Sequence, residues 1–129
     1  MSRRRLGVTR RNAVPMRGND RPALTLRIDL GDRGAIGPGK ISLLEAIDSE
    51  GSITAAGKKI GMSYRGAWLL VENVNKMFKQ PVVSTRHGGA KGGRSSLTRL
   101  GTEVVSRYRQ IEKAAERSAS KHLKFLAGV

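Results

Sequence analysis

The stretch from Ser52 to Phe78 constrains the fold more than any other part of the chain, because it contains two helical patterns separated by a turn signal. Ser52 and Ser63 each precede an apolar stripe and can cap a helix, and Gly61 allows the positive φ of a sharp turn. The stripes consist of Ile53, Ala56 and Ile60 in the first pattern and of Ala67, Leu70, Val71, Val74 and Phe78 in the second. This spacing predicts a helix-turn-helix, in which Gly57 leaves room for the second helix to approach.

Patterns upstream of this pair predict one strand and one further helix. Residues 24–30 alternate apolar and polar side chains, as a half-buried strand does, and a glycine-rich loop at 31–39 follows them. The stripe that predicts the next helix, which ends near residue 51, consists of Ile41, Leu44 and Ile47.

Downstream of the pair, strand-like segments at 82–86 and 95–98 enclose a glycine-rich loop, as in a β-hairpin. A long last helix begins at Thr98. We therefore predict a mainly α protein with a small β-hairpin, organised as a winged helix-turn-helix with a long C-terminal helix.

The glycine-rich loop at 87–94 has a second interpretation, a phosphate-cradling nucleotide site, because it contains four glycines. A P-loop needs Gly-Lys-Ser/Thr in register and a helix immediately after it, and this loop has neither. We interpret the loop as a wing that contacts the DNA backbone or the minor groove. The wing residues expected to make these contacts are Arg86, His87, Lys91 and Arg94.

The formal net charge of +15 predicts a polyanionic partner, and nucleic acid fits better than a membrane surface. Charge is concentrated outside the proposed core: residues 1–22 carry seven Arg and one Asp, and residues 80–101 carry four basic and no acidic side chains. Residues 23–79 are nearly neutral, with eight basic and six acidic side chains.

Other function classes are excluded or disfavoured by composition. The chain has no Cys and two isolated His, so we expect no metal site, no cofactor and no catalysis. The arginines at 3–5 lack the apolar region that follows an export signal, and no run of about 20 apolar residues spans a bilayer. We expect a cytoplasmic, nucleoid-associated protein without membrane contact.

We expect one domain with two tails. Residues 1–22 are predicted to be a flexible basic arm, either a solvated leader or a segment that contacts DNA. The domain spans 23–119, and 120–129 form a C-terminal tail. Within the last helix, Val104, Tyr108, Ile111 and Ala115 follow a heptad-like seam that predicts a homodimer interface, together with Ile41 and Leu44 of the earlier helix.

Several short motifs together resemble a known family. They are Ile41-Ser-Leu-Leu-Glu, Gly51-Ser-Ile-Thr, Ile60-Gly-Met-Ser-Tyr-Arg-Gly-Ala-Trp68, Gly88-Gly-Ala-Lys-Gly-Gly93 and Leu97-Thr-Arg-Leu-Gly101. From about Leu24 to Ala115 the chain resembles the N-terminal DNA-binding domain of the ModE family of molybdate-responsive regulators, relatives of the LysR-type winged helices. The resemblance implies a dimer with each recognition helix in a major groove. The family's oxyanion-binding domain has no counterpart up to Val129, so we expect no molybdate sensing by this chain itself.

The predicted function is therefore transcription regulation by binding double-stranded DNA. Arg65 and Tyr64 are expected to touch base edges or backbone, while Gly66 lets the helix sit deep in the groove. The predicted DNA-binding residues are Ser52, Thr54, Ser63, Tyr64, Arg65, Gly66, Arg86, His87, Lys91 and Arg94. Trp68 is interpreted as a core or interface anchor rather than a base-stacking residue.

Two alternatives stay open at this point. Charge alone does not distinguish DNA from RNA, so an RNA-binding or ribosome-associated basic protein is the first, although few aromatic residues are available to stack on single-stranded bases. The second is a DNA-binding module whose sensor protein is a separate chain.

Overall fold

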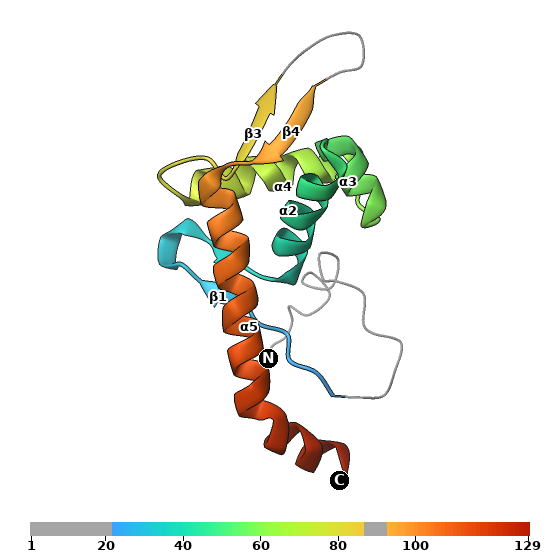
Figure 1. Ribbon diagram of the computed structural model, residues 1–129, viewed down its shortest axis with the longest axis vertical. Coiled ribbons are helices and arrows are strands. Elements are labelled where there is room, and N and C mark those ends of the chain that lie inside the picture. The colour runs from blue at the N-terminus through green and yellow to red at the C-terminus, as the bar shows by residue number, and fades with distance from the viewer. Residues whose placement is uncertain (1–21, 87–92) are drawn as a thin grey trace.

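The computed structural model describes residues 22–86 and 93–129. Two short strand pairs flank a set of three helices, and a long fourth helix closes the chain (Figure 1). The elements are β1 (Ile28–Asp29), the 3-10 turn η1 (Gly31–Arg33), β2 (Ala35–Ile36), α2 (Pro38–Glu50), α3 (Ile53–Lys59), α4 (Tyr64–Met77), β3 (Val83–Arg86), β4 (Arg94–Leu97) and α5 (Arg99–Ala127). The prediction of a mainly helical chain with a small hairpin and a long last helix is confirmed. Among the described residues, no helix is long and apolar enough to cross a membrane.

The core lies among α2, α3, α4 and the first half of α5, and α2 contributes its centre. Ile41 and Leu44 are 0% and 1% exposed, enclosed by side chains of their own chain. The prediction that places these two residues in a dimer interface is therefore corrected. An apolar helical stripe marks a buried face, and here the face is covered within one chain.

The turn between α3 and α4 has the local chemistry expected from the sequence. Ser52 and Ser63 cap the two helices, with Ser52 Oγ accepting from the N–H of Ala55 at 2.9 Å. Gly61 has φ of 79°, in the left-handed region. Gly57 lies so close to α4 that an added Cβ would be 2.8 Å from the Cβ of Ala67. Even alanine would therefore require the two helices to shift apart.

The strand predicted at 24–30 is shorter than expected, and β2 lies in the stretch predicted as loop. Ile28 pairs opposite Ile36, and continuing this register would place Leu26 opposite Pro38, which has no N–H and already begins α2. The Leu26 carbonyl instead accepts a hydrogen bond from the Tyr108 hydroxyl at 2.8 Å. The predicted alternation holds, because the half-buried side chains are Leu24, Leu26, Ile28 and Leu30.

Helix α4 ends one residue earlier than predicted. Phe78, assigned to its apolar stripe, has an extended backbone at the C-cap position and is half-buried. Arg33 holds this end: its Nη1 donates to the carbonyl of Met77 at 3.2 Å, and its guanidinium lies 5.9 Å from the centre of the Phe78 ring. A cation at a helix C-terminus complements the free carbonyls there.

Helix α5 is fixed at its first turn and extends past the other elements at its C-terminal half (Figure 1). Thr98 Oγ1 accepts from the N–H of Gly101 at 3.0 Å and donates to the carbonyl of Pro81 at 2.8 Å. A Cβ added at Gly101 would overlap the carbonyl oxygen of Val82. The helix continues to Ala127, so the stretch 120–129 predicted as a tail is mostly helical.

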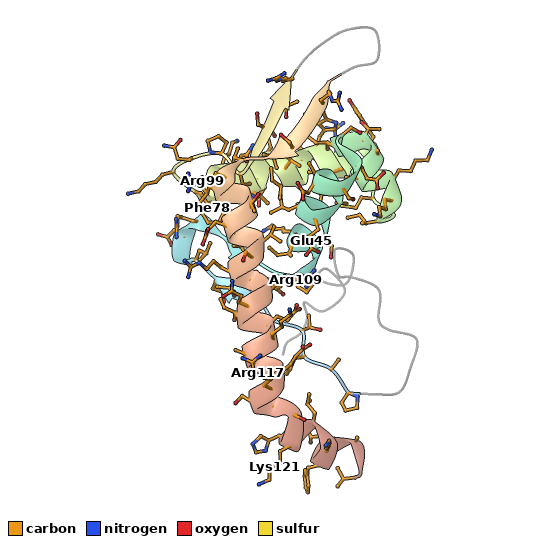
Figure 2. The ribbon with its side chains drawn as sticks, in the orientation of Figure 1. Glu45, Phe78, Arg99, Arg109, Arg117 and Lys121 are labelled. Carbon is orange, nitrogen blue, oxygen red and sulfur yellow. The ribbon has the colours of Figure 1, made fainter. Side chains whose placement is uncertain are left out.

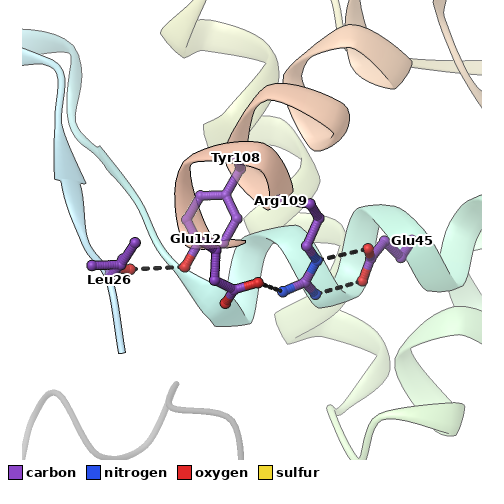
Figure 3. Close-up of polar contacts among 5 residues, drawn as sticks. All are labelled: Leu26, Glu45, Tyr108, Arg109 and Glu112. Atoms are coloured by element: carbon purple, nitrogen blue, oxygen red, sulfur yellow. Dashed lines mark hydrogen bonds and ion pairs between the residues drawn. The ribbon is translucent and has the colours of Figure 1, made fainter. Parts of the chain in front are cut away.

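A polar cluster joins the middle of α5 to the body (Figure 3). Arg109 binds Glu45 of α2 through two hydrogen bonds, of 2.9 and 2.7 Å, and binds Glu112 at 2.7 Å. The bonds to Glu45 are the main cause that raises the pKa of Arg109. Tyr108 is buried beside this cluster, and its hydroxyl donates a hydrogen bond to the Leu26 carbonyl. Its predicted place in a dimer seam is therefore corrected as well: the ring fills the core of its own chain.

Candidate nucleic-acid interface

The first turn of α4 presents three of the predicted site residues to solvent. Ser63, Tyr64 and Arg65 are all exposed, and 63% of the Tyr64 surface is accessible. Ser63 Oγ accepts from the N–H of Gly66 at 3.0 Å, which leaves its hydroxyl hydrogen free to donate. The positive end of a 14-residue helix therefore meets solvent next to an arginine, an arrangement suited to an anion.

Gly66 has a structural role that differs from the predicted one. It is half-buried, and a Cβ added there would lie 3.0 Å from Ser63 Oγ. The missing side chain thus makes room for the cap of α4.

Two predicted residues lie at the start of α3. The Ser52 hydroxyl serves as the helix cap, and Thr54 in the first turn is exposed. Of the two lysines that end α3, Lys59 lies 3.3 Å from Glu50 Oε2, so its charge is partly compensated on the protein surface. Lys58 is exposed.

The hairpin places two arginines directly opposite each other. β3 and β4 are antiparallel, and the register pairs Arg86 with Arg94 at the outer end of the described strands. Both side chains are exposed. Like charges opposite each other destabilise a strand pair, so an anion that contacts both would relieve the repulsion. His87 and Lys91, the other predicted wing residues, lie outside the described residues.

Two contacts that the sequence analysis did not identify fix the hairpin against the helices. The N–H of Ser95 in β4 donates to the carbonyl of Gly51, between α2 and α3, at 2.9 Å. Asn75 of α4 bonds the backbone at the start of β3, accepting from the N–H groups of Val82 and Val83 at 2.7 and 3.0 Å. Figure 1 shows α3, α4 and the hairpin gathered at one end of the molecule. The candidate surface is therefore one connected unit.

The outward side of α4 carries further residues that sequence reasoning missed. Leu69 and Glu72 are exposed and follow Arg65 at helical spacings of four and three residues, which places all three on one face. A shallow groove on this face is lined by Tyr64, Arg65, Trp68, Leu69 and Glu72. The same spacing, counted from Arg65 on the side opposite the apolar stripe, would have identified Leu69 and Glu72 from the sequence.

Trp68 is half-buried at the edge of this groove, and its ring centroid lies 6.2 Å from that of Tyr64. Its indole N–H is enclosed and has no acceptor within the described part of the chain. The same part of the chain contains no group of three or more His, Asp or Glu side chains that could hold a metal ion.

Cations also lie far from this surface. Figure 2 shows Arg117 and Lys121 on the half of α5 that extends beyond the body, whereas Arg99 lies at the start of the helix, near the candidate surface. A helix rises about 1.5 Å per residue, so Lys121 is roughly 30 Å along the axis from Arg99. Charges at that distance are screened from a ligand on α4 at physiological ionic strength.

Comparison with known proteins relates the chain to one group of bacterial proteins. It is 38% identical over 89 residues to the molybdenum transport protein ModE of Azotobacter vinelandii, an alignment that covers 69% of the chain and 32% of that relative. It is 36% identical over 98 residues to the molybdenum-pterin-binding protein MopA of Rhodobacter capsulatus, covering 74% of the chain and 37% of MopA. No protein-family model matches the chain.

A third relative is the DNA-binding transcriptional dual regulator ModE of Escherichia coli strain K12, 37% identical over 71 residues, which cover 55% of the chain and 27% of that protein. The chain spans about a third of the length of these curated relatives. These similarities support a relationship to the ModE family, in agreement with the resemblance of the motifs.

Proposed function

We propose that this chain, related to the ModE family, is a DNA-binding transcriptional regulator of the LysR-type helix-turn-helix kind. In this proposal α3, α4 and the β3–β4 hairpin form a winged helix-turn-helix. Helix α4 enters the major groove of a duplex, and the hairpin lies on the adjacent backbone or minor groove. Such a role places the protein on the nucleoid in the cytoplasm and involves no catalysis.

The observation that carries the proposal is the arrangement of three exposed arginines. Arg86 and Arg94 lie opposite each other in the hairpin, and the hairpin is bonded to α4, whose first turn contains Arg65. The hydrogen bonds of Asn75 and the bond from Ser95 to Gly51 fix the position of the hairpin, with its two arginines, relative to the first turn of α4. A duplex offers phosphates at regular spacing along both sides of a groove, so it can meet both surfaces at once. The printed name of the Escherichia coli relative supports DNA as the ligand class.

We also propose that the protein acts as a homodimer through the part of the α5 seam that lies beyond Tyr108. Ile111 is 47% exposed on this part of the seam, and Ala115 follows one helical turn later. Val104, at the start of the seam, is half-buried because it packs against the core of its own chain. Because Ile41, Leu44 and Tyr108 are enclosed in the core, the proposed interface starts at Ile111 and continues along α5 to Phe125 and Leu126, which are 68% and 58% exposed.

The proposal is tested by competition at about 0.15 M salt between a labelled DNA duplex and unlabelled DNA or RNA duplexes of equal length. We expect DNA to compete better than RNA, because the A-form major groove is too narrow to admit α4. Equal or better competition by RNA would overturn the proposal in favour of an RNA-binding protein.

Replacing single basic residues in the same assay shows which surface of the protein binds the duplex. Arg94→Ala should weaken binding to every duplex, whereas Lys121→Ala removes the same charge from the far half of α5 and should change binding little. An equal loss in both variants would show that total charge, rather than the α4 and hairpin surface, determines binding.

A further inference from the structure

The outward face of α4 contains an apolar side chain where a DNA-binding surface is expected to be polar. Leu69 is 54% exposed and lies between Arg65 and Glu72 on the same face. The core side of the helix, marked by Ala67, Val71 and Val74, is on the opposite side. Leu69 therefore lies outside the enclosed core and lines the groove on the outward face, where a ligand of α4 can contact it.

We infer that the groove at Leu69 receives the C5-methyl group of a thymine, which makes Leu69 a specificity-determining residue for that base. The inference rests on the proposed function. In the major groove thymine alone presents an apolar group, while the other base edges present hydrogen-bond donors and acceptors that leucine cannot satisfy. A leucine pressed against those edges would leave polar groups desolvated without partners.

The neighbours of Leu69 fit an occupant that is DNA rather than a second protein copy. Arg65, one turn earlier, can donate to guanine or to a phosphate, and Glu72, one turn later, can accept from a cytosine amino group. The opposed Arg86 and Arg94 are linked to the same helix through Asn75. A second copy that docked through this same surface would place its own Arg65, Arg86 and Arg94 against these cations, whereas a duplex carries the complementary charge.

The test uses the full chain and a duplex selected by it from a random-sequence pool. Each thymine of the selected duplex is replaced, one at a time, by deoxyuridine, which lacks only the methyl group. For the wild type we expect one thymine in each half-site at which the replacement weakens binding about fourfold, as for the burial of one methyl group. For Leu69→Ala the same replacement should have no effect.

Val129→Ala is the control, because it shortens another aliphatic side chain, one that is 87% exposed and lies outside the proposed DNA-binding and dimer surfaces. This variant should keep the wild-type sensitivity to deoxyuridine. Leu69 and Val129 are both exposed, so the circular dichroism and melting temperature of each variant should be close to those of the wild type.

The inference is overturned if no thymine of the selected duplex is sensitive in the wild type, or if Leu69→Ala stays as sensitive as the wild type. It is also overturned if sedimentation shows that Leu69→Ala alone dissociates the protein, since a second copy would then occupy the groove. Failure to select any duplex from the pool would instead contradict the proposed function itself.

Discussion

The side-chain amide of Asn75 binds the backbone of Val83 in both directions: Oδ1 accepts from its N–H at 3.0 Å, and Nδ2 donates to its carbonyl at 3.3 Å. The same Oδ1 accepts from the N–H of Val82 at 2.7 Å. Asn75 thus takes the place of a neighbouring strand for the beginning of β3. Because Asn75 belongs to α4, this contact sets the position of the hairpin relative to the helix proposed to enter the groove.

Asn75→Ala should lower the free energy of unfolding by about 2 kcal/mol, because it leaves the partly buried backbone groups of Val82 and Val83 without partners. Asn73→Ala, an exposed site on the same helix, should change it by no more than about 0.5 kcal/mol. Urea unfolding of the two variants gives the comparison. Equal stabilities would show that the amide is not needed to hold the hairpin.

Gly101→Ala should be among the most damaging single substitutions in the helices. The added Cβ overlaps the Val82 carbonyl oxygen, which itself accepts from the N–H of Thr98, so neither backbone segment can move without breaking the start of α5. We expect a loss of at least about 3 kcal/mol, the upper range for overpacking. Thr102→Ala, at the exposed next residue, is the control, and thermal melting is the measurement. A Gly101→Ala protein as stable as the control would refute this packing.

The stability of the protein should fall with rising pH above pH 10 in a way that depends on Tyr108. Burial, with a smaller contribution from Glu112, raises the pKa of the Tyr108 hydroxyl above its ordinary value of 10.0, and Arg109 opposes the shift. The unfolded chain loses this proton near pH 10 while the folded protein retains it. The stabilisation is therefore complete below pH 10 and is lost as the pH rises through the raised value.

Tyr108→Phe should lower the free energy of unfolding by about 1 kcal/mol at neutral pH, because the Leu26 carbonyl loses its donor. It should also remove the loss of stability above pH 10 that comes from the Tyr108 hydroxyl. Tyr64→Phe changes the other tyrosine, which is 63% exposed, and should keep the wild-type profile. Chemical unfolding between pH 8 and pH 11.5 measures both. Identical slopes above pH 10 in all three proteins would exclude Tyr108 as the source.

Ile111→Asp should dissociate the proposed dimer without unfolding the chain, because the side chain is 47% exposed on α5 and outside the enclosed core. Ser106→Asp adds the same charge to an exposed site on another face of α5 and should leave assembly unchanged. Sedimentation velocity at tens of micromolar gives the masses. A wild-type monomer, or a dimer that persists in Ile111→Asp, would contradict the α5 interface.

The parts of the fold that depend on local chemistry could be predicted from the sequence. Ser52 and Ser63 cap two helices at the expected places, α5 begins one residue after the expected Thr98, and Gly61 adopts the positive φ that the turn requires. These features depend on residues within one helical turn of each other. Their prediction therefore needs no knowledge of tertiary contacts.

The features that were missed depend on contacts between distant segments. The roles of Asn75 and Gly101 follow from the position of Val82, and nothing in their immediate neighbours indicates it. Ile41 and Leu44 were assigned to an interface because a hydrophobic stripe does not show whether its cover comes from the same chain or another. In the candidate site, the start of the predicted recognition helix indicates Arg65 and the basic glycine-rich loop indicates Arg86 and Arg94, whereas Leu69 lies outside both signals.

Sequence-specific binding of DNA by α4 is tested by the ratio of affinities for the selected duplex and for a scrambled duplex of the same composition. This ratio is measured for the wild type, Arg65→Ala and Arg86→Ala. Sequence recognition by α4 predicts a wild-type ratio of at least about 10³ at physiological salt. Arg65→Ala should reduce this ratio by an amount corresponding to about 1–3 kcal/mol, and Arg86→Ala should weaken both duplexes alike and lower the salt slope by about one. A wild-type ratio near one would contradict sequence recognition by α4.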